Sequence, residues 1–387
     1  MKILHLFSDW KWTGPAEPVV NLCCALQKRG HEVVLAYRRP PFNYPESVEK
    51  GVMERDLKVI DYFHLTPISK PYQIHRLKTL ISDIRRISHY IHDEGFEIVN
   101  VHNSHDHIVG GLAVRMSKGH PLVIRMDHKS DSLSADFIRR WFFKRYTDGL
   151  ITFSERGRNR LVKELGFPSG NVAKVTTAVD LVRFDPRRVS KDMRTVFGIS
   201  SSSPIVGIVA RFQRYRKTEI LLEAFSMLIE HIPEAKLILV GRSSQMRESV
   251  IEPMERLGIA SHVVVTGYRI EDYVDTLGCI DIFVLLTPGS DGTARALREA
   301  MAMGKPVVVT RRGMLPELVQ HGFHGFVVEE NPEELCKALL KMISDESLRR
   351  NMGNACCELA KERFSLERQA EEVEDLYIRL VDAGKEL

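Results

Sequence analysis

The chain has 387 residues, a net charge of +4 and an apolar fraction of 44%. This length exceeds one ordinary domain, and two domains of about 180 residues each fit it. The charge is too small to require nucleic acid as a partner, and the six cysteines lack the spacing of a zinc site. We therefore expect a reduced, metal-free protein with two hydrophobic cores.

The amino-terminal segment MKILHLF is soon interrupted by Asp9 and Lys11, which makes it too short for a signal peptide. No apolar run reaches the roughly 18 residues that a membrane-spanning helix needs. These features predict a cytoplasmic protein and leave open a peripheral contact with the inner face of the cell membrane.

Strand and helix patterns alternate through the first half of the chain. Short apolar runs bounded by turn residues predict strands at 3–7, 31–37, 97–102, 122–127 and 150–154. Helices are expected at 19–28 and at about 75–92. The second of these has one apolar face, formed by Leu77, Ile81, Ile84 and Ile91. Residues 40–71, rich in proline and aromatic side chains, are expected to be irregular.

The second half repeats this alternation after a polar, charged stretch at residues 186–203, which we interpret as a linker. It would separate a first domain (1–185) from a second (204–365), and a final helix is expected at 366–387. The second domain has β-branched runs at 204–210, 236–241, 262–267, 282–287, 306–310 and 325–328. Such alternation predicts parallel sheets with right-handed crossovers. The expected fold class is α/β, with two Rossmann-like, doubly wound domains.

Two motifs that would indicate other enzymes are absent. No GxGxxG sequence follows the first strand and no GK[ST] marks a P-loop, which argues against a dinucleotide-dependent dehydrogenase. Ligands of open α/β sheets bind beyond the carboxyl ends of the strands. With two such domains facing each other, the cleft between them is the expected site.

The segment 290–306, SDGTARALREAMAMGKP, is the most informative of the chain. Asp291 precedes a turn, Glu299 follows eight positions later within a short apolar helix, and Gly304 and Pro306 end that helix. Amides at a helix start bind phosphate, and two carboxylates accept hydrogen bonds from hydroxyl groups. A nucleotide sugar suits both features. The alternative, an ordinary amphipathic helix after a surface turn, leaves an acid among alanines and methionines unexplained.

Two cations follow the first strand of the second domain. Arg211 and Lys217 lie in GIVARFQRYRK, where fixed positive charge would stabilise a departing diphosphate more than the bound substrate. A solvated basic loop is the alternative, because Arg214 and Arg216 crowd the same stretch.

The first domain offers a histidine at a strand end. His102 ends the run EIVNVH, where it can donate a hydrogen bond to a sugar hydroxyl. His105 and His107 follow in the same loop, so metal binding is an alternative that we disfavour. Asp127 and His128, past the next strand end, are weaker candidates for contact with an acceptor.

A glycine-containing turn precedes the first helix. Gly14, after Thr13, would let the backbone approach a diphosphate or an acceptor, because a side chain there would obstruct it. Alone, a glycine before a helix indicates only a turn.

Together these segments resemble the retaining glycosyltransferases of family four, which have the two-domain GT-B fold. Segment 290–306 is similar to the E-x7-E signature of that family, EGFGxxxxEAMAxGxPVV, with Asp291 for the first acid and Glu299 for the second. The Arg211–Lys217 spacing resembles the family's GRxxxxxK, and residues 13–17 resemble its GGAE loop. The resemblance extends over most of the chain, including residues 154–184, 267–269 and 313–317.

The resemblance implies site roles and an enzyme without metal or other cofactor. Glu299 would bind the ribose hydroxyls, and Arg211 with Lys217 the diphosphate. Asp291, with the adjacent backbone, would bind the donor sugar. Further contacts to the substrates would come from Gly292, Thr293, Ala294, His102, Tyr268, Arg269, Thr13, Gly14, Asp127 and His128.

The expected function is retaining transfer of a sugar from a nucleoside diphosphate to a hydroxyl of a surface glycan or lipid-linked saccharide. One alternative is a GT-B epimerase or a sugar-phosphate synthase with a soluble acceptor. Another is a non-catalytic subunit that binds nucleotide sugars. The replacement of the family's Asn-Gly by Thr177-Ala178 and the shorter acid at Asp291 favour that subunit.

Residues 136–146, DFIRRWFFKRY, mix aromatic and basic side chains. This composition suits a helix on an anionic membrane surface. We slightly favour the alternative, a helix that packs on the first domain and has a basic outer edge.

Overall fold

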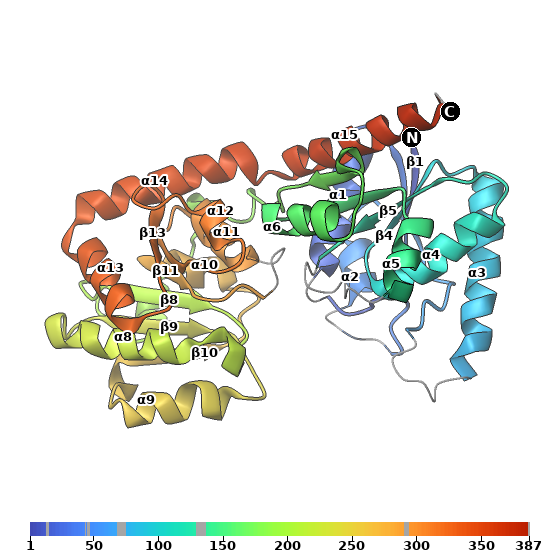
Figure 1. The fold of residues 1–387 in the computed structure, drawn as a ribbon. Helices are drawn as coiled ribbons and strands as arrows, with labels where there is room; N and C mark the ends of the chain where they lie inside the picture. The colour runs from blue at the N-terminus through green and yellow to red at the C-terminus, as the bar shows by residue number, and fades with distance from the viewer. Residues whose placement is uncertain are drawn as a thin grey trace. The chain divides into compact units, whose positions relative to one another are not determined.

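The computed structural model describes residues 1–12, 15–42, 44, 47–67, 75–128, 137–289 and 294–385. The chain forms two compact units, one made of Met1–Ala178 with Leu366–Leu387 and the other of Val179–Ser365. In Figure 1 the red carboxyl-terminal helix thus belongs to the same unit as the blue amino-terminal strands. The polar stretch 186–203 falls in the second unit.

The first unit is built on a parallel sheet of seven strands in the order β3-β2-β1-β4-β5-β6-β7. The strands are β1 (Lys2–Phe7), β2 (Glu32–Tyr37), β3 (Lys58–Ile60), β4 (Ile98–Val101), β5 (Leu122–Met126), β6 (Gly149–Thr152) and β7 (Val172–Lys174). Their apolar side chains are buried on both faces, as in sheets that are covered by crossover helices. The strand order reverses between β1 and β4, and such a switch point is where open α/β sheets bind ligands.

The helices of this unit are α1 (Ala16–Lys28), α2 (Val48–Met53), α3 (His75–Glu94), α4 (Ser104–Met116), α5 (Phe137–Arg145), α6 (Glu155–Asn159) and α15 (Leu366–Lys385). The expectation of an irregular segment at 40–71 is wrong in part, because α2 and β3 lie within it. The apolar face expected on α3 is buried at Ile84 and Ile91, whereas Leu77 and Ile81 are exposed.

The carboxyl-terminal helix α15 completes the core of the first unit. Ala370, Val373 and Leu376 are fully buried in the same cluster as side chains of α1 and β1. The Asn100 amide on β4 donates to the Tyr377 hydroxyl at 2.5 Å. At the rim, Glu374 accepts hydrogen bonds from the side chains of Arg29 and His31.

The second unit has six parallel strands in the order β10-β9-β8-β11-β12-β13. They are β8 (Ile205–Val209), β9 (Lys236–Val240), β10 (Val263–Gly267), β11 (Ile282–Leu285), β12 (Val307–Thr310) and β13 (Gly325–Val328). The helices are α7 (Met193–Val196), α8 (Thr218–His231), α9 (Glu252–Arg256), α10 (Tyr273–Gly278), α11 (Arg295–Ala302), α12 (Leu315–Leu318), α13 (Pro332–Ser344) and α14 (Glu346–Arg363). Two parallel, Rossmann-like sheets confirm the predicted fold class.

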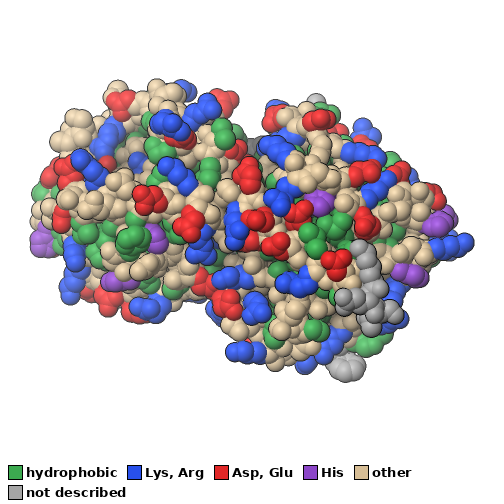
Figure 2. Space-filling model, turned by 90° about the horizontal axis from the view of Figure 1, so that it is seen from above, with side chains coloured by type: hydrophobic (Ala, Val, Ile, Leu, Met, Phe, Trp, Pro, Cys, Tyr) green, Lys and Arg blue, Asp and Glu red, His purple; other side chains and the backbone are tan. Residues whose placement is uncertain are grey.

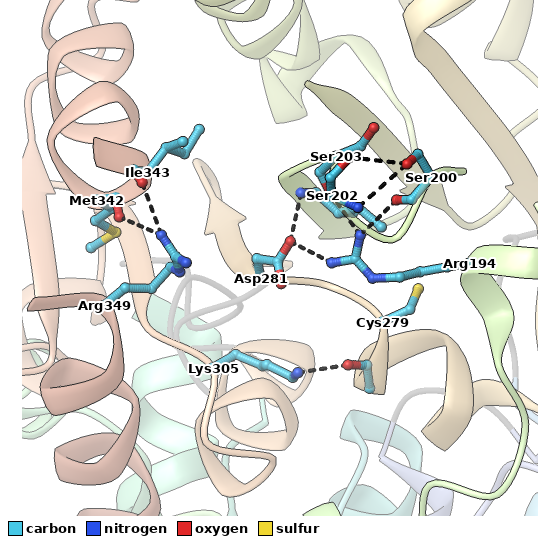
Figure 3. A network of polar contacts seen from close by, with 12 residues as sticks. Arg194, Ser200, Ser202, Ser203, Cys279, Asp281, Lys305, Met342, Ile343 and Arg349 are labelled. Atoms are coloured by element: carbon cyan, nitrogen blue, oxygen red, sulfur yellow. Dashed lines mark hydrogen bonds and ion pairs between the residues drawn. The ribbon is translucent and has the colours of Figure 1, made fainter. Parts of the chain in front are cut away.

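A polar network closes the amino-terminal edge of the second sheet (Figure 3). Arg194 donates to the Asp281 carboxylate at 2.7 Å and to the Ser203 carbonyl at 2.7 Å. The same carboxylate accepts the backbone N–H of Ile205, the first residue of β8. Lys305, just before β12, donates to the carbonyl of Gly278. The charges at this edge are therefore matched to acceptors within the unit.

Among the described residues, no helix is both long and apolar enough to cross a membrane. In α5 the Phe143 ring is buried, while Trp141 is 56% exposed. Phe143 contacts the ring of His107 at a centroid separation of 4.6 Å, so α5 packs on its unit through this residue. Figure 2 shows acidic and basic side chains interspersed over the face that it draws, in keeping with the small net charge.

Candidate functional site

The buried acid of the second unit is held by two donors. Glu299 lies on α11 and is 3% exposed. One of its carboxylate oxygens accepts the Tyr273 hydroxyl at 2.6 Å, and the other accepts Nε of Arg295, one helical turn earlier, at 2.6 Å. Each oxygen can accept a further hydrogen bond, because a carboxylate oxygen has two lone pairs. The arrangement fixes a carboxylate that can still bind hydroxyl groups.

Tyr273 is a permanent donor in this arrangement. Burial, followed by the nearby Glu299 carboxylate, raises the pKa of Tyr273 well above its ordinary value. Its hydroxyl therefore stays protonated and orients Glu299. Sequence reasoning missed Tyr273, because its contact with α11 depends on how α10 and α11 pack.

The turn before α11 is described only at its last residue. Ala294 is the residue that precedes the helix, and it is 1% exposed. Asp291, Gly292 and Thr293 lie outside the described residues. The far end of the helix is as predicted: Gly304 has a φ of +68°, the left-handed conformation that favours glycine after a helix.

The two cations expected to hold a diphosphate differ in their surroundings. Arg211 follows β8, is exposed, and makes no side-chain hydrogen bond or ion pair with the described part of the chain. Lys217 has a φ of +55° where α8 begins, and its ammonium group pairs with Glu330. Glu330 also accepts from Arg312 at 2.7 Å. Arg211 thus has an uncompensated charge, whereas that of Lys217 is already matched.

The environment of Glu330 explains why this pairing is stable. Burial alone would raise the pKa of Glu330, but hydrogen bonds from Lys217 and Arg312 outweigh burial and lower the pKa. The carboxylate stays ionised and fixes the end of the Lys217 side chain.

The neighbouring arginines are not equivalent. Arg216 is half-buried and donates to the Thr287 carbonyl, beyond the end of β11, at 2.6 Å. Burial lowers the pKa of Arg216. Arg214 is exposed. The alternative of a solvated basic loop therefore does not describe Arg216, which connects this loop to the end of β11.

The candidates for contact with the nucleobase follow β10. The Tyr268 ring is 53% exposed, and the guanidinium of Arg242 lies 4.7 Å from its centre. Arg269 instead forms an ion pair with Asp272, with Nε 2.9 Å from a carboxylate oxygen. Tyr268 therefore presents an aromatic face, whereas the guanidinium of Arg269 is engaged within the unit.

In the first unit, His102 lies directly after β4 and is 2% exposed. Its Nε2 lies 3.0 Å from Nδ1 of His5, and its Nδ1 lies 3.2 Å from Nε2 of His128. Both nitrogens of His102 are thus engaged with other imidazoles. His5 was not predicted, because in sequence it is one polar residue in an apolar strand.

The imidazoles of His5 and His102 are neutral. Burial, reinforced by His5, His128 and Arg125, lowers the pKa of His102 well below its ordinary value. Burial alone lowers the pKa of His5 to about 3. Within the described ranges, no group of three or more His, Cys, Asp or Glu side chains is arranged to hold a metal ion.

The other first-unit candidates are placed as follows. Nε2 of His107 lies 2.8 Å from the Thr147 hydroxyl, which is a different partner from those of His102. Asp127 follows β5 and is 3% exposed. Thr13 and Gly14 lie outside the described residues.

Comparisons with known proteins agree with this architecture. Residues 13–183 match the family model described as Glycosyltransferase Family 4, and residues 189–357 match Glycosyl transferases group 1. An Escherichia coli UDP-Gal:alpha-D-GlcNAc-diphosphoundecaprenol alpha-1,3-galactosyltransferase is 25% identical over 78% of this chain and 81% of its own. A Bacillus anthracis N-acetyl-alpha-D-glucosaminyl L-malate synthase is 24% identical over 91% of this chain and 90% of its own.

Solved structures show the same fold. The crystal structure of Anabaena HepE in complex with UDP superposes with a TM-score of 0.78, covering 97% of this chain and 99% of that chain at 19% identity. The predicted resemblance is confirmed: the chain belongs to the family four glycosyltransferases and has the GT-B fold.

Proposed function

We propose that this chain transfers a sugar from a nucleoside diphosphate sugar to a hydroxyl of a surface glycan or lipid-linked saccharide, with retention at the anomeric carbon. The observation that carries the proposal is the buried Glu299 carboxylate, oriented by Tyr273 and Arg295 and able to accept ribose hydroxyls. The UDP complex of HepE and the name of the Escherichia coli relative support a nucleotide donor and a lipid-linked acceptor.

In this proposal the second unit binds the donor. Asp291 and the backbone of Gly292, Thr293 and Ala294 bind the sugar and phosphate, and Tyr268 with the backbone of Arg269 lies beside the base. Arg211 and Lys217 hold the diphosphate. Negative charge on the diphosphate grows as the glycosidic bond breaks, so a cation fixed beside it lowers the barrier. Arg211 suits this role because its charge is uncompensated.

The carboxyl edge of the first sheet supplies the remaining contacts. His102 would contact the donor sugar, Asp127 and His128 would contact the acceptor, and the backbone of Thr13 and Gly14 would approach the diphosphate or the acceptor. Attack occurs on the face that the phosphate leaves, and the leaving phosphate takes the proton of the acceptor hydroxyl.

The proposal is tested in two steps. The protein is first titrated with UDP-, GDP-, ADP- and dTDP-sugars, and we expect one donor to bind through both nucleotide and sugar. That donor is then incubated with lipid-linked saccharides and with malate, because the Bacillus anthracis relative is named for a soluble acceptor. NMR of the product should show an unchanged anomeric configuration.

Three outcomes would contradict the proposal in different ways. Inverted product would exclude the retaining mechanism. Donor binding without transfer or hydrolysis for every acceptor would favour a non-catalytic binding subunit. Conversion of the donor in the absence of any acceptor would favour an epimerase.

A further inference from the structure

The exposed face of α3 borders a cavity that contains none of the candidate site residues. Its volume is about 380 Å³, which is within the range of pockets that hold small ligands. The second half of α3 (Figure 1) forms one side, and a tyrosine that follows the edge strand β3 forms the other. The lining residues are Tyr62, Arg85, Arg86, His89, Tyr90 and Asp93.

Arg86 is oriented by two aromatic rings. The centre of its guanidinium lies 5.2 Å from the ring centre of Tyr62 and 5.8 Å from that of Phe63. A guanidinium that lies over an aromatic ring keeps its N–H groups for a planar acceptor such as a carboxylate or a phosphate. The N–H groups of Arg86 make no hydrogen bond or ion pair with any residue that the structure describes. Arg86 is therefore an oriented set of donors that lacks an acceptor.

Three further donor groups belong to lining residues and lack a protein partner. The Arg85 guanidinium and the hydroxyl groups of Tyr62 and Tyr90 make no hydrogen bond within the described ranges. Burial raises the pKa of Tyr62, and it raises the pKa of Tyr90 to about 12. Both phenols therefore stay protonated at neutral pH and can donate. A ligand with several acceptor oxygens would satisfy these groups.

The charge of the cavity favours an acidic ligand. Arg85 and Arg86 are positive, and Asp93 alone opposes them among the lining residues. The neighbouring Glu94 does not change this balance, because its carboxylate pairs with the ammonium group of Lys2 at 2.6 Å. Two unpaired guanidinium groups bind a carboxylate or a phosphate group through short, charge-assisted hydrogen bonds.

The other lining groups distinguish an acidic sugar from a bare anion. Tyr62 is 50% exposed, so part of its ring offers an apolar surface to the C–H groups of a sugar. The Asp93 carboxylate has no hydrogen bond or ion pair with a described residue and can accept from sugar hydroxyl groups. Nδ1 of His89 lies 2.7 Å from the Arg85 carbonyl oxygen, which leaves a lone pair on Nε2 of the neutral ring. A bare anion would use neither the ring nor these acceptors.

We propose that this cavity is a second saccharide site, which binds an acidic sugar residue. Arg85 and Arg86 bind its carboxylate or phosphate group. Asp93 accepts its hydroxyl groups, and its apolar face lies against Tyr62. The inference goes beyond the proposed function, because the site shares no residue with the candidate catalytic site and needs no donor. A saccharide chain held here stays at high effective concentration near the protein.

Binding of small probes tests the assignment. The full-length chain is titrated without nucleotide with methyl glucuronide, glucose 1-phosphate, methyl glucoside, acetate and inorganic phosphate, and each Kd is measured by saturation-transfer NMR. We expect at least one acidic sugar to bind about tenfold or more tightly than methyl glucoside, as for one charge-assisted hydrogen bond. It should also bind more tightly than either bare anion. Equal binding of methyl glucoside or of a bare anion, or no binding of either acidic sugar, would overturn the proposal.

Two matched variants of α3 locate this binding. Arg86→Gln removes a positive charge from the cavity, whereas Lys78→Gln removes one from an exposed position of the same helix outside it. Arg86→Gln should weaken acidic-sugar binding by about tenfold or more, and Lys78→Gln should leave it unchanged. Both side chains are exposed, so both variants should fold. Equal affinities in the two variants would contradict the site.

Two further variants separate the cavity from the donor site. Tyr62→Ala removes the ring and should weaken acidic-sugar binding, whereas Tyr62→Phe should retain most of it. Arg211→Ala lies in the second unit and should leave acidic-sugar binding unchanged. If Arg211→Ala abolishes the binding and Tyr62→Ala does not, the probe occupies the donor site and the proposal fails.

An anionic membrane is the alternative ligand for a basic surface with exposed aromatic rings. Vesicles of phosphatidylglycerol and phosphatidylcholine are therefore added to the protein with its bound acidic sugar. We expect the sugar to stay bound. Displacement by these vesicles, but not by phosphatidylcholine alone, would assign the cavity to anionic lipid and overturn the proposal.

These measurements separate the inference from the proposed function. They contain no donor, so acidic-sugar binding by a chain that transfers no sugar would leave this site intact and remove the function. Transfer activity without acidic-sugar binding would do the reverse.

Discussion

Two arginines at opposite edges of the second sheet differ in their partners. At the amino edge, Arg194 is matched by Asp281 and by carbonyl groups within the unit. At the carboxyl edge, Arg211 is exposed and unpaired within the described part of the chain. The comparison indicates that Arg194 contributes stability at the amino edge, whereas the charge of Arg211 at the carboxyl edge is available for a ligand, unlike that of Lys217, which Glu330 already matches. Substitutions at the two edges should therefore affect different measurements.

The largest effect on activity is expected from Arg211→Ala. Because the cation would stabilise the departing diphosphate, kcat should fall by roughly 10²–10³-fold, as when one oxyanion donor is lost. Arg214→Ala is the matched control, since Arg214 is an exposed arginine of the same loop. Arg216 is unsuitable because it holds the Thr287 carbonyl. If steady-state kinetics show a higher KM and an unchanged kcat for both variants, the loop acts only as a basic surface.

Glu299→Gln should weaken nucleotide binding. Each charge-assisted hydrogen bond to a ribose hydroxyl contributes about 1.5–3 kcal/mol, which corresponds to roughly 10- to 150-fold in Kd. Calorimetry with the sugar-free nucleoside diphosphate measures this loss. Tyr273→Phe removes one orienting donor but keeps the carboxylate, so a smaller loss is expected. Unchanged affinity of a folded Glu299→Gln protein would exclude Glu299 from the ribose site.

Tyr268→Ala should lower donor affinity by about tenfold. An aromatic face that stacks on a base typically contributes 1–3 kcal/mol, and the exposed ring of Tyr268 offers such a face. Tyr268→Phe, which retains the ring, should bind the donor like the native chain. If both variants bind equally well, the base lies elsewhere.

The smallest effect on activity is expected at the amino edge. Arg194→Ala leaves Asp281 without its cation, so the free energy of unfolding should fall by about 2 kcal/mol while kcat and KM stay unchanged. Thermal unfolding should show a lower Tm for the second unit. Arg187→Ala is the control, because Arg187 forms an ion pair on the open surface and should leave Tm unchanged. A loss of kcat in Arg194→Ala would contradict the assignment of stability to the amino edge and of activity to Arg211.

The strands and the buried acid follow from local sequence. β-Branched runs between turn residues identified the strands of the second sheet, and the apolar neighbours of Glu299 indicated its burial. The short strand β7 was missed because three residues between polar neighbours give no period. Helix α2 and strand β3 were missed because proline and aromatic residues around them obscured the pattern.

The partners of the site residues could not be predicted from the sequence. Arg214 and Arg216 are equivalent in composition, and only the position of the Thr287 carbonyl separates them. The contacts of His102 with His5 and His128 depend on β4 lying between β1 and β5, which is a property of the sheet topology. In each case the deciding contact joins residues that are distant in sequence.

The carboxyl-terminal helix has a consequence for synthesis on the ribosome. Tyr377 and Leu376 fill the core of the first unit, although they are translated after the whole of the second unit. The second unit is complete at Ser365 and can fold as soon as it emerges. The first unit, translated earlier, must wait with an open groove over α1 until α15 arrives. Its nascent form therefore exposes apolar surface for longer than that of the second unit does.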